Sequence, residues 1–82
     1  MNTIEIALLH QIIADYKFAQ YITQRIDIGD FDDDTANTIY DRIVDILFEE
    51  KPVSFARLLK HFHEDKVVVE ALRKIAAHQA AV

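Results

Sequence analysis

The 82-residue chain contains no cysteine, one glycine and one proline. Because there is no cysteine, neither a disulfide framework nor a thiolate metal site can form, which fits a reducing compartment such as the cytoplasm. The shortage of glycine and proline leaves little material for linkers, hairpins or phosphate-binding loops. No apolar run approaches the ~18 residues of a membrane span, and the start lacks the basic stretch and apolar core of a signal peptide. We therefore expect one soluble, all-α domain over residues 1–82, located in the cytoplasm.

Charged residues are unevenly distributed along the chain. Residues 1–50 contain eleven acidic and three basic side chains, whereas residues 51–82 contain six basic and three acidic ones. The acidic half disfavours binding of a nucleic-acid backbone by the surface as a whole. The basic end could contact nucleic acid, but a solvated helix face explains it more simply. We expect weak binding of nucleic acid by this domain, or none.

The longest helical pattern covers about residues 34–50. Its apolar residues recur at the three- and four-residue spacing of a helix and are Ala36, Ile39, Tyr40, Ile43, Val44, Ile46, Leu47 and Phe48. Acidic residues 32–34 supply capping oxygens and favourable charge at its start. Pro52 stops it near Glu50, because proline lacks an N–H and disfavours a helical residue before it.

More than half of the circumference of this helix is apolar, so we expect neighbours on several sides. The central stripe contains Tyr40, Ile43 and Leu47, and Ile39 and Ile46 widen it. The sequence therefore predicts a compact bundle of five or six helices around this long helix, with Tyr40, Ile43 and Leu47 in the core.

Two helices are predicted before it. The first covers residues 3–14, starts with Asn2 and Glu5 as a capping box, and has an apolar face made of Ile4, Leu8, Leu9, Ile12 and Ile13. The second begins after its cap, Asp15, and ends near Ile26. Residues 27–33 contain glycine and several aspartates, which favour turns, and their apolar residues form no repeating helical or strand pattern. We therefore expect a loop anchored by Phe31.

Two more helices are predicted after Pro52. Ser54 caps a short helix to about His61, with Val53 and Leu58 placed to form a hydrophobic staple. The last helix runs over about residues 66–79. Its start contains three consecutive valines, which on propensity alone could form a strand, but no partner strand is visible in the sequence.

Acidic residues and histidines are the candidates for a metal site. Asp30, Asp32, Asp34 and Asp41 fall at positions of a calcium-binding loop, but Thr35 stands where the turn needs glycine, and we interpret these acids as caps. A zinc site would need His10 and His78 to converge with His61 or His63 from other helices. We interpret the histidines as surface or helix-end residues and expect no metal and no cofactor.

Catalysis is not expected, because no nucleophile has a placed base and the best-placed hydroxyls are accounted for as caps. Tyr16 and Tyr21 are more informative. Both lie on or beside the polar side of the second helix, and tyrosine is favoured at protein interfaces. They are candidates for partner binding, although tyrosines at the edge of a core have the same pattern.

The segments LLHQIIADYKFAQYI, GDF and TIYDRIVDILFEEKPVSFARLLKHF together resemble a helical domain shared by two bacterial replication proteins. These are the C-terminal helicase-binding domain of primase and the N-terminal domain of the replicative DNA helicase. The resemblance covers about residues 5–62 and has no catalytic signature. The positions that match are the inter-helix turn, the loop aromatic, the start of the central helix and the corner after it, namely Asp15, Phe31, Ile39 with Tyr40, and Pro52 with Val53.

Two departures separate the chain from the helicase version. His10 stands where the helicase usually has glycine after a valine-leucine pair, and the glycine-glycine turn after the fourth helix is missing. The proline-containing lead-in is missing as well. The pairs Leu8-Leu9 and Ile12-Ile13 are closer to the primase version. The resemblance therefore favours primase, with the helicase domain as the alternative.

The resemblance implies a protein-interaction module that docks primase on the hexameric replicative helicase. The catalytic and zinc-binding parts of primase are absent from the sequence, as is the terminal helical hairpin that usually follows the bundle, so we expect an excised subdomain of a larger protein. The candidate contact residues are the two tyrosines and the acids of the loop, namely Tyr16, Tyr21, Asp30, Asp32 and Asp33.

Overall fold

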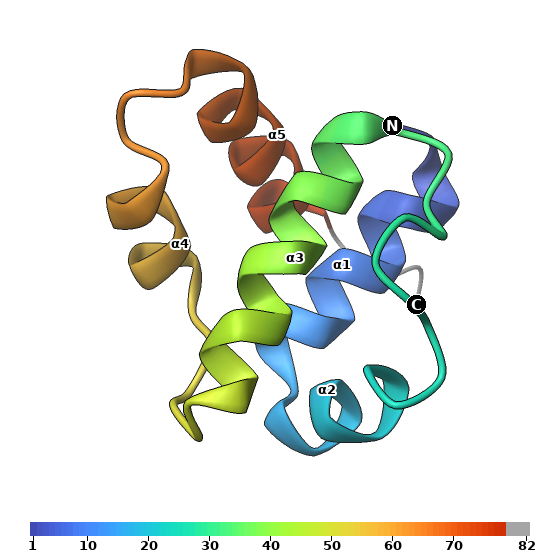
Figure 1. Ribbon diagram of the computed structural model, residues 1–82. Coiled ribbons are helices and arrows are strands. Elements are labelled where there is room, and N and C mark those ends of the chain that lie inside the picture. The colour runs from blue at the N-terminus through green and yellow to red at the C-terminus, as the bar shows by residue number, and fades with distance from the viewer. Residues whose placement is uncertain (79–82) are drawn as a thin grey trace.

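The computed structural model describes residues 1–78 and has the predicted all-helical fold (Figure 1). Its helices are α1 (Thr3–Ala14), α2 (Tyr16–Ile22), α3 (Asp34–Phe48), α4 (Phe55–His61) and α5 (Lys66–Ala77). Within these residues there is no strand, and the three valines predicted as helical belong to α5. The predicted end of the last helix at Gln79 lies outside the described residues.

Every one of these helices begins with the same local hydrogen bond. A side-chain oxygen of the residue before the helix accepts the backbone N–H three residues later, at donor–acceptor distances between 2.8 and 3.1 Å. The capping residues are Asn2, Asp15, Asp33, Ser54 and Asp65. The capping box of Asn2 and Glu5 is also formed. Because each cap contributes about 1 kcal/mol and acts over three residues, the helix starts follow directly from the sequence.

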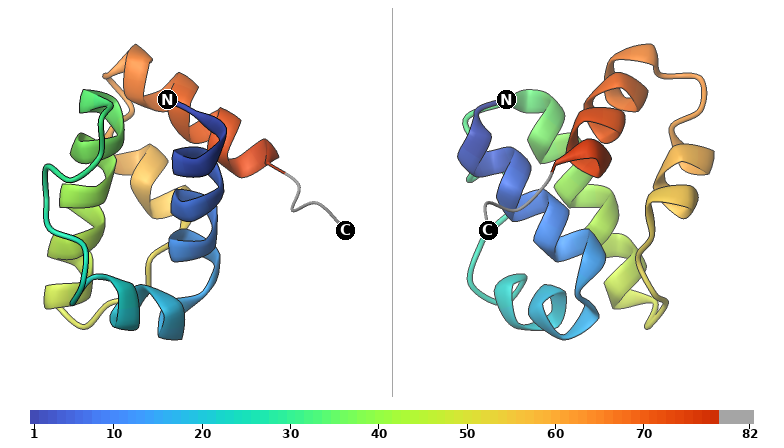
Figure 2. Two further views of the ribbon diagram at one scale, coloured as in Figure 1. Left: turned by 90° about the vertical axis from the view of Figure 1, so that its right-hand side faces the viewer. Right: turned by 180° about the vertical axis from the view of Figure 1, so that it is seen from behind.

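The helices pack around α1 and α3. These two helices contact each other and both contact α5, whereas α4 contacts α3 and α5, and α2 contacts α1. Figure 2 shows α2 at the end of the bundle where α3 finishes, away from α5. The Cα radius of gyration is 11.6 Å, close to the ~12 Å of a compact chain of this size.

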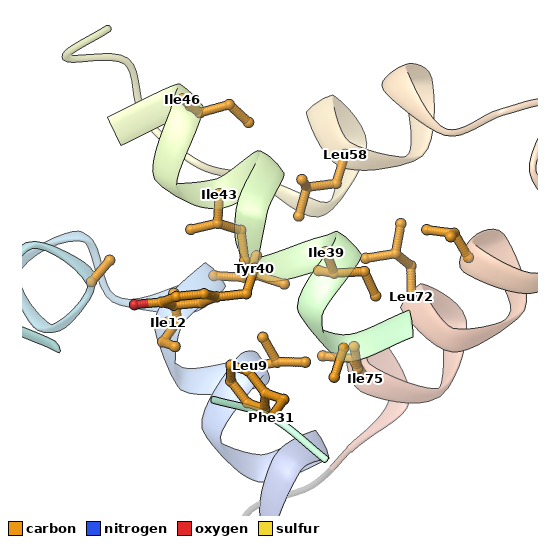
Figure 3. Close-up of a cluster of buried hydrophobic side chains, with 14 residues drawn as sticks. Leu9, Ile12, Phe31, Ile39, Tyr40, Ile43, Ile46, Leu58, Leu72 and Ile75 are labelled. Atoms are coloured by element: carbon orange, nitrogen blue, oxygen red, sulfur yellow. The ribbon is translucent and has the colours of Figure 1, made fainter. Parts of the chain in front are cut away.

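The core is centred on the middle of α3 (Figure 3). Tyr40 and Ile43 are fully buried, as predicted. Leu47 is only half-buried, and the prediction that it belongs to the core was wrong. Ile39 and Ile46, predicted to widen the apolar stripe, are buried as well, because α4 and α5 both pack on α3. Residues from the other elements that complete the core are Leu9, Ile12, Ile13, Ala19, Phe31, Leu58, Val68, Leu72 and Ile75.

Helix α3 ends two residues earlier than predicted, and Pro52 is not the direct cause. Glu50 has φ +59°, a left-handed conformation that closes a Schellman motif. The N–H of Glu50 donates to the carbonyl of Leu47 at 2.9 Å, and that of Lys51 donates to the carbonyl of Ile46 at 3.2 Å. The chain has therefore already turned away from the helix axis before the proline is reached.

Helix α2 is also shorter than predicted and ends at Ile22, not near Ile26. The hydroxyl of Thr23 donates to the carbonyl of Ala19 at 2.7 Å. The carbonyl of Ile22 then accepts two N–H groups, from Arg25 at 2.9 Å and from Ile26 at 3.0 Å. These bonds tighten the last turn, and the chain enters the loop at residue 27.

Candidate functional site

The acidic loop, residues 27–33, is held from two helices. The carboxylate of Glu5 on α1 accepts the N–H of Asp32 at 3.1 Å and that of Asp33 at 3.4 Å, and only 8% of Glu5 is exposed. From α3, the side-chain amide of Asn37 accepts the N–H groups of Gly29 and Phe31 and donates to the carbonyl of Phe31. These bonds hold the backbone of the loop against α1 and α3.

Between α1 and this loop lies a groove of about 290 Å³, here named the acidic-loop groove. Its apolar wall contains Ile4, Leu8, Ile26 and Phe31, and its polar lining contains Asn2, Glu5, Asp30 and Asp32. Ile4 is 79% exposed, although the sequence predicted it on the buried face of the first helix. The prediction failed because Glu5, Leu9 and Ile12 point into the bundle, which turns Ile4 outward to the groove.

Of the three predicted loop acids, Asp30 and Asp32 line the acidic-loop groove. The carboxylate of Asp30 also accepts the N–H of Asp27 at 2.8 Å. Asp33 has a structural position instead, because it caps α3 and lies 3.4 Å from the N-terminal amine of Met1. The hydrogen bond from the N–H of Ala36 lowers the pKa of the Asp33 carboxyl, since it stabilises the charged form.

The two predicted tyrosines are both exposed, but they do not form one surface. They are five residues apart on α2, a spacing that places them on different sides of a helix. The guanidinium of Arg25 stacks on the ring of Tyr21 at 3.7 Å from its centroid. Tyr16 instead shares a helix face with Gln20 and Thr23, four and seven residues further on.

The sequence interpretation missed Phe48, which is 90% exposed in the last turn of α3. It was counted in the apolar pattern of that helix, but helical spacing places it three residues after Asp45 and seven after Asp41, on the polar side. The position of Phe48 on the polar side of the helix could therefore have predicted its exposure from the sequence. Phe48 borders a groove of about 270 Å³, here named the α2/α3 groove, whose lining residues are Gln20, Thr23, Gln24, Val44, Leu47 and Phe48.

A third hollow, of about 400 Å³, lies between the starts of α1 and α3 and the helix α5. Its lining combines apolar residues, among them the exposed Val67, with charges of both signs from Asp33, Lys66, Glu70 and Lys74. No single sign of charge or residue type dominates it, so it indicates no class of ligand.

The histidines considered for zinc are only partly brought together. The rings of His10 and His78 are 5.7 Å apart, and Nδ1 of His10 lies 2.8 Å from the carbonyl oxygen of Ile75. His61 packs its ring against Phe62, and His63 lies 2.9 Å from the carbonyl of Lys60. In the described part of the chain, no three histidine, aspartate or glutamate side chains are grouped to hold a metal ion.

None of the helices in residues 1–78 has both the length and the hydropathy needed to cross a bilayer. Comparisons of the chain with family models, with curated proteins and with solved structures gave no match. The resemblance to the primase and helicase domains is therefore carried by the residue pattern alone.

Proposed function

We propose that this domain is a non-catalytic protein-interaction module of bacterial DNA replication, which docks primase on the replicative helicase in the cytoplasm. The observation that carries the general part of the proposal is the exposure of large apolar side chains on α1 and α3. Ile4 and Phe48, exposed to 79% and 90%, each border a groove. Asp30 and Asp32 line the groove beside Ile4, and Asp45 lies three residues before Phe48 on α3. Exposed apolar residues beside a groove and rimmed by polar groups are typical of protein-interaction sites.

The identity of the partner comes from the resemblance. The matching positions include Phe31, Ile39 and Tyr40, which belong to the buried core. They therefore support a shared fold, whereas the recognition of helicase depends on surface residues that the pattern does not specify. For the alternative, a collar domain of the helicase itself, the resemblance implies the same helical bundle, and primase would be its partner.

A titration tests both versions. The ¹⁵N-labelled domain is titrated with the hexameric replicative helicase of its own organism and, separately, with its primase, and amide shifts are followed by nuclear magnetic resonance. We expect localised shifts with the helicase, at residues of the acidic-loop groove or the α2/α3 groove. Shifts with primase but not with helicase would favour the collar domain. If neither protein causes shifts at high micromolar concentration, the replication proposal is wrong.

Binding of nucleic acid is the competing function for the basic end of the chain. Phosphate binding by several lysines and arginines would give an affinity for single-stranded DNA that falls steeply with salt. We expect weak binding at low salt and none that is measurable at physiological salt. Micromolar or tighter binding at physiological salt would contradict the proposal and favour a nucleic-acid-binding domain.

A further inference from the structure

The α2/α3 groove has an apolar floor and an exposed aromatic edge. Val44 and Leu47 are half-buried and line it from α3, and Phe48 stands beside them almost fully exposed. Burying an exposed phenylalanine removes a large apolar area from water, which is the main favourable term in protein association. Phe48 has no such partner within the described residues, so this edge is suited to a partner's apolar side chain.

The opposite wall of the groove is polar but uncharged. Gln20 and Gln24, four residues apart on α2, are exposed and line the groove together with Thr23. Their side-chain amides can donate and accept hydrogen bonds at the edge of a docked segment. Figure 1 shows α2 and the last turns of α3 at the same end of the molecule, and the groove is lined by residues of both segments.

The charge next to Phe48 is negative. Asp41 and Asp45 are exposed and lie on the same side of α3 as Phe48, seven and three residues before it. Glu49 follows directly, although Lys51 pairs with it at 3.2 Å. The C-terminal end of the helix adds the negative end of its dipole. A partner segment that packs an apolar side chain on Phe48 therefore lies beside the negative charges of Asp41 and Asp45. Basic residues of that segment would face these two carboxylates.

We propose that the α2/α3 groove binds a basic amphipathic helix of a partner protein. Leucine-like side chains of that helix pack on Val44, Leu47 and Phe48, and its lysines or arginines face Asp41 and Asp45. A helix is the fitting occupant because the groove lies between two helices and the described residues offer no sheet edge for an added strand. This inference rests on the general part of the proposed function, an interaction module, and does not depend on the helicase as partner.

A second copy of the chain fits this face less well. An isologous contact through Phe48 would place the same acidic patch, with Asp41 and Asp45, of both copies in one interface. Like charges placed opposite each other oppose association. The charge pattern therefore selects a basic partner over self-association through this face.

The test uses a synthetic peptide of about 18 residues, long enough to be helical, with leucines at helical spacing and lysines at the other positions. The control peptide has glutamate in place of every lysine. We expect the lysine peptide to shift amides of the groove residues, above all those of Gln20, Val44 and Phe48, and the glutamate peptide to shift none. Shifts centred on the acidic-loop groove, or equal shifts with both peptides, would overturn the proposal.

Matched variants separate this groove from general attraction to an acidic protein. Phe48→Ala should weaken binding of the lysine peptide by about 10-fold or more, whereas Val67→Ala, which also removes an exposed apolar side chain, should leave it unchanged. The double variant Asp41→Asn with Asp45→Asn should weaken binding by about 3-fold or more at low salt. Its control, Glu64→Gln with Glu70→Gln, removes the same charge elsewhere and should have little effect. Equal losses in variant and control would contradict the proposal.

Two further measurements complete the test. Thermal melting checks that Phe48→Ala remains folded, which is expected because its side chain makes little buried contact. Sedimentation of the unmodified domain should show a monomer, and a dimer that Phe48→Ala abolishes would make a second copy the occupant and overturn the proposal.

The titration with helicase tests the proposed function independently of the peptide experiment. If helicase binds but Phe48→Ala has no effect on it or on the peptide, the groove is wrong and the proposed function stands. If the peptide binds in the groove and helicase does not bind, the helicase assignment fails.

Discussion

The hydroxyl of Tyr40 donates a 2.6 Å hydrogen bond to the backbone carbonyl of Ile26. Tyr40 is fully buried in the middle of α3, and its ring packs on Phe31 with 5.3 Å between centroids. The bond therefore connects the central helix to the turn that follows α2. Burial raises the pKa of Tyr40 above its ordinary value of 10.0, and the negative charges of Asp27 and Asp30 raise it further.

Tyr40→Phe should lower the free energy of unfolding by about 1–2 kcal/mol at neutral pH, because the carbonyl of Ile26 loses its partner. The raised pKa adds a pH dependence. The folded state holds the Tyr40 proton more tightly than the unfolded state, so this stabilisation is complete below pH ~10 and decreases as the pH rises from there through the folded-state pKa. Urea unfolding between pH 8 and 11 measures both effects.

The phenylalanine variant should lose this part of the alkaline dependence, so the difference between the two proteins should shrink above pH ~10. Tyr21→Phe is the control, because Tyr21 is exposed, and it should change stability by less than about 0.5 kcal/mol. If the free energies of unfolding of the unmodified protein and Tyr40→Phe differed by the same amount up to pH 11, the pKa of Tyr40 would not be raised by folding.

Glu5→Gln should destabilise the acidic loop. The two carboxylate oxygens of Glu5 accept the N–H groups of Asn2 and Asp32, and an amide has only one oxygen to offer. We expect the free energy of unfolding, measured with urea, to fall by about 1–2 kcal/mol. Hydrogen exchange at the amide of Asp32 should become faster. Glu70→Gln, at an exposed position of α5, should change neither quantity. Unchanged exchange at Asp32 in the Glu5 variant would show that this contact does not hold the loop.

Ile43→Ala and Leu47→Ala should differ, although both residues belong to the predicted stripe of α3. Ile43 is fully buried, so its truncation leaves a cavity and should cost about 2–5 kcal/mol. Leu47 is half-buried at the α2/α3 groove, and its truncation should cost clearly less. Thermal and urea unfolding of the two variants measure the order, and a larger loss for Leu47→Ala would contradict the core described above.

Glu50→Gly should stabilise the protein. Glu50 has φ +59°, a region that costs a residue with a Cβ about 1–2 kcal/mol, and glycine adopts it freely. The extra freedom of glycine in the unfolded chain offsets part of this gain, so we expect a net increase of about 0.5–1 kcal/mol. Glu49→Gly, at the neighbouring position with negative φ, should be destabilising. A loss of stability in Glu50→Gly would contradict the left-handed turn at the end of α3.

Removal or addition of metal should not change the melting temperature. The rings of His10 and His78 lie close together, but no third metal ligand joins them among the described residues. Asp34 and Asp41, both in α3, belong to no group of three possible ligands either. A metal that bound the folded protein would raise its stability. Melting curves with a chelator, with calcium and with zinc should therefore coincide, and a shift of several degrees with stoichiometric metal would restore a metal-binding function.

The predicted helix starts were correct because each depends on contacts within three residues. A capping oxygen at Asn2, Asp15 or Ser54 bonds the N–H three positions further on, and no other part of the chain is needed. The predicted ends at Ala14 and His61 were also correct, whereas α2 and α3 end earlier than predicted. The end of α3 depends on a left-handed Glu50, a conformation that a glutamate does not signal in a sequence.

The sequence by itself determined the all-helical class, the caps at Asn2, Asp15 and Ser54, and the placement of Tyr40 and Ile43 on one apolar face, because helical spacing sets a shared face whatever the partner helices are. Only the tertiary structure decided which side of each helix is covered. Apolar spacing placed Ile4 and Phe48 with the apolar faces, yet the packing of the other helices leaves both exposed. The grooves beside them join residues distant in the chain, and their position follows from how whole helices pack, which no local pattern specifies.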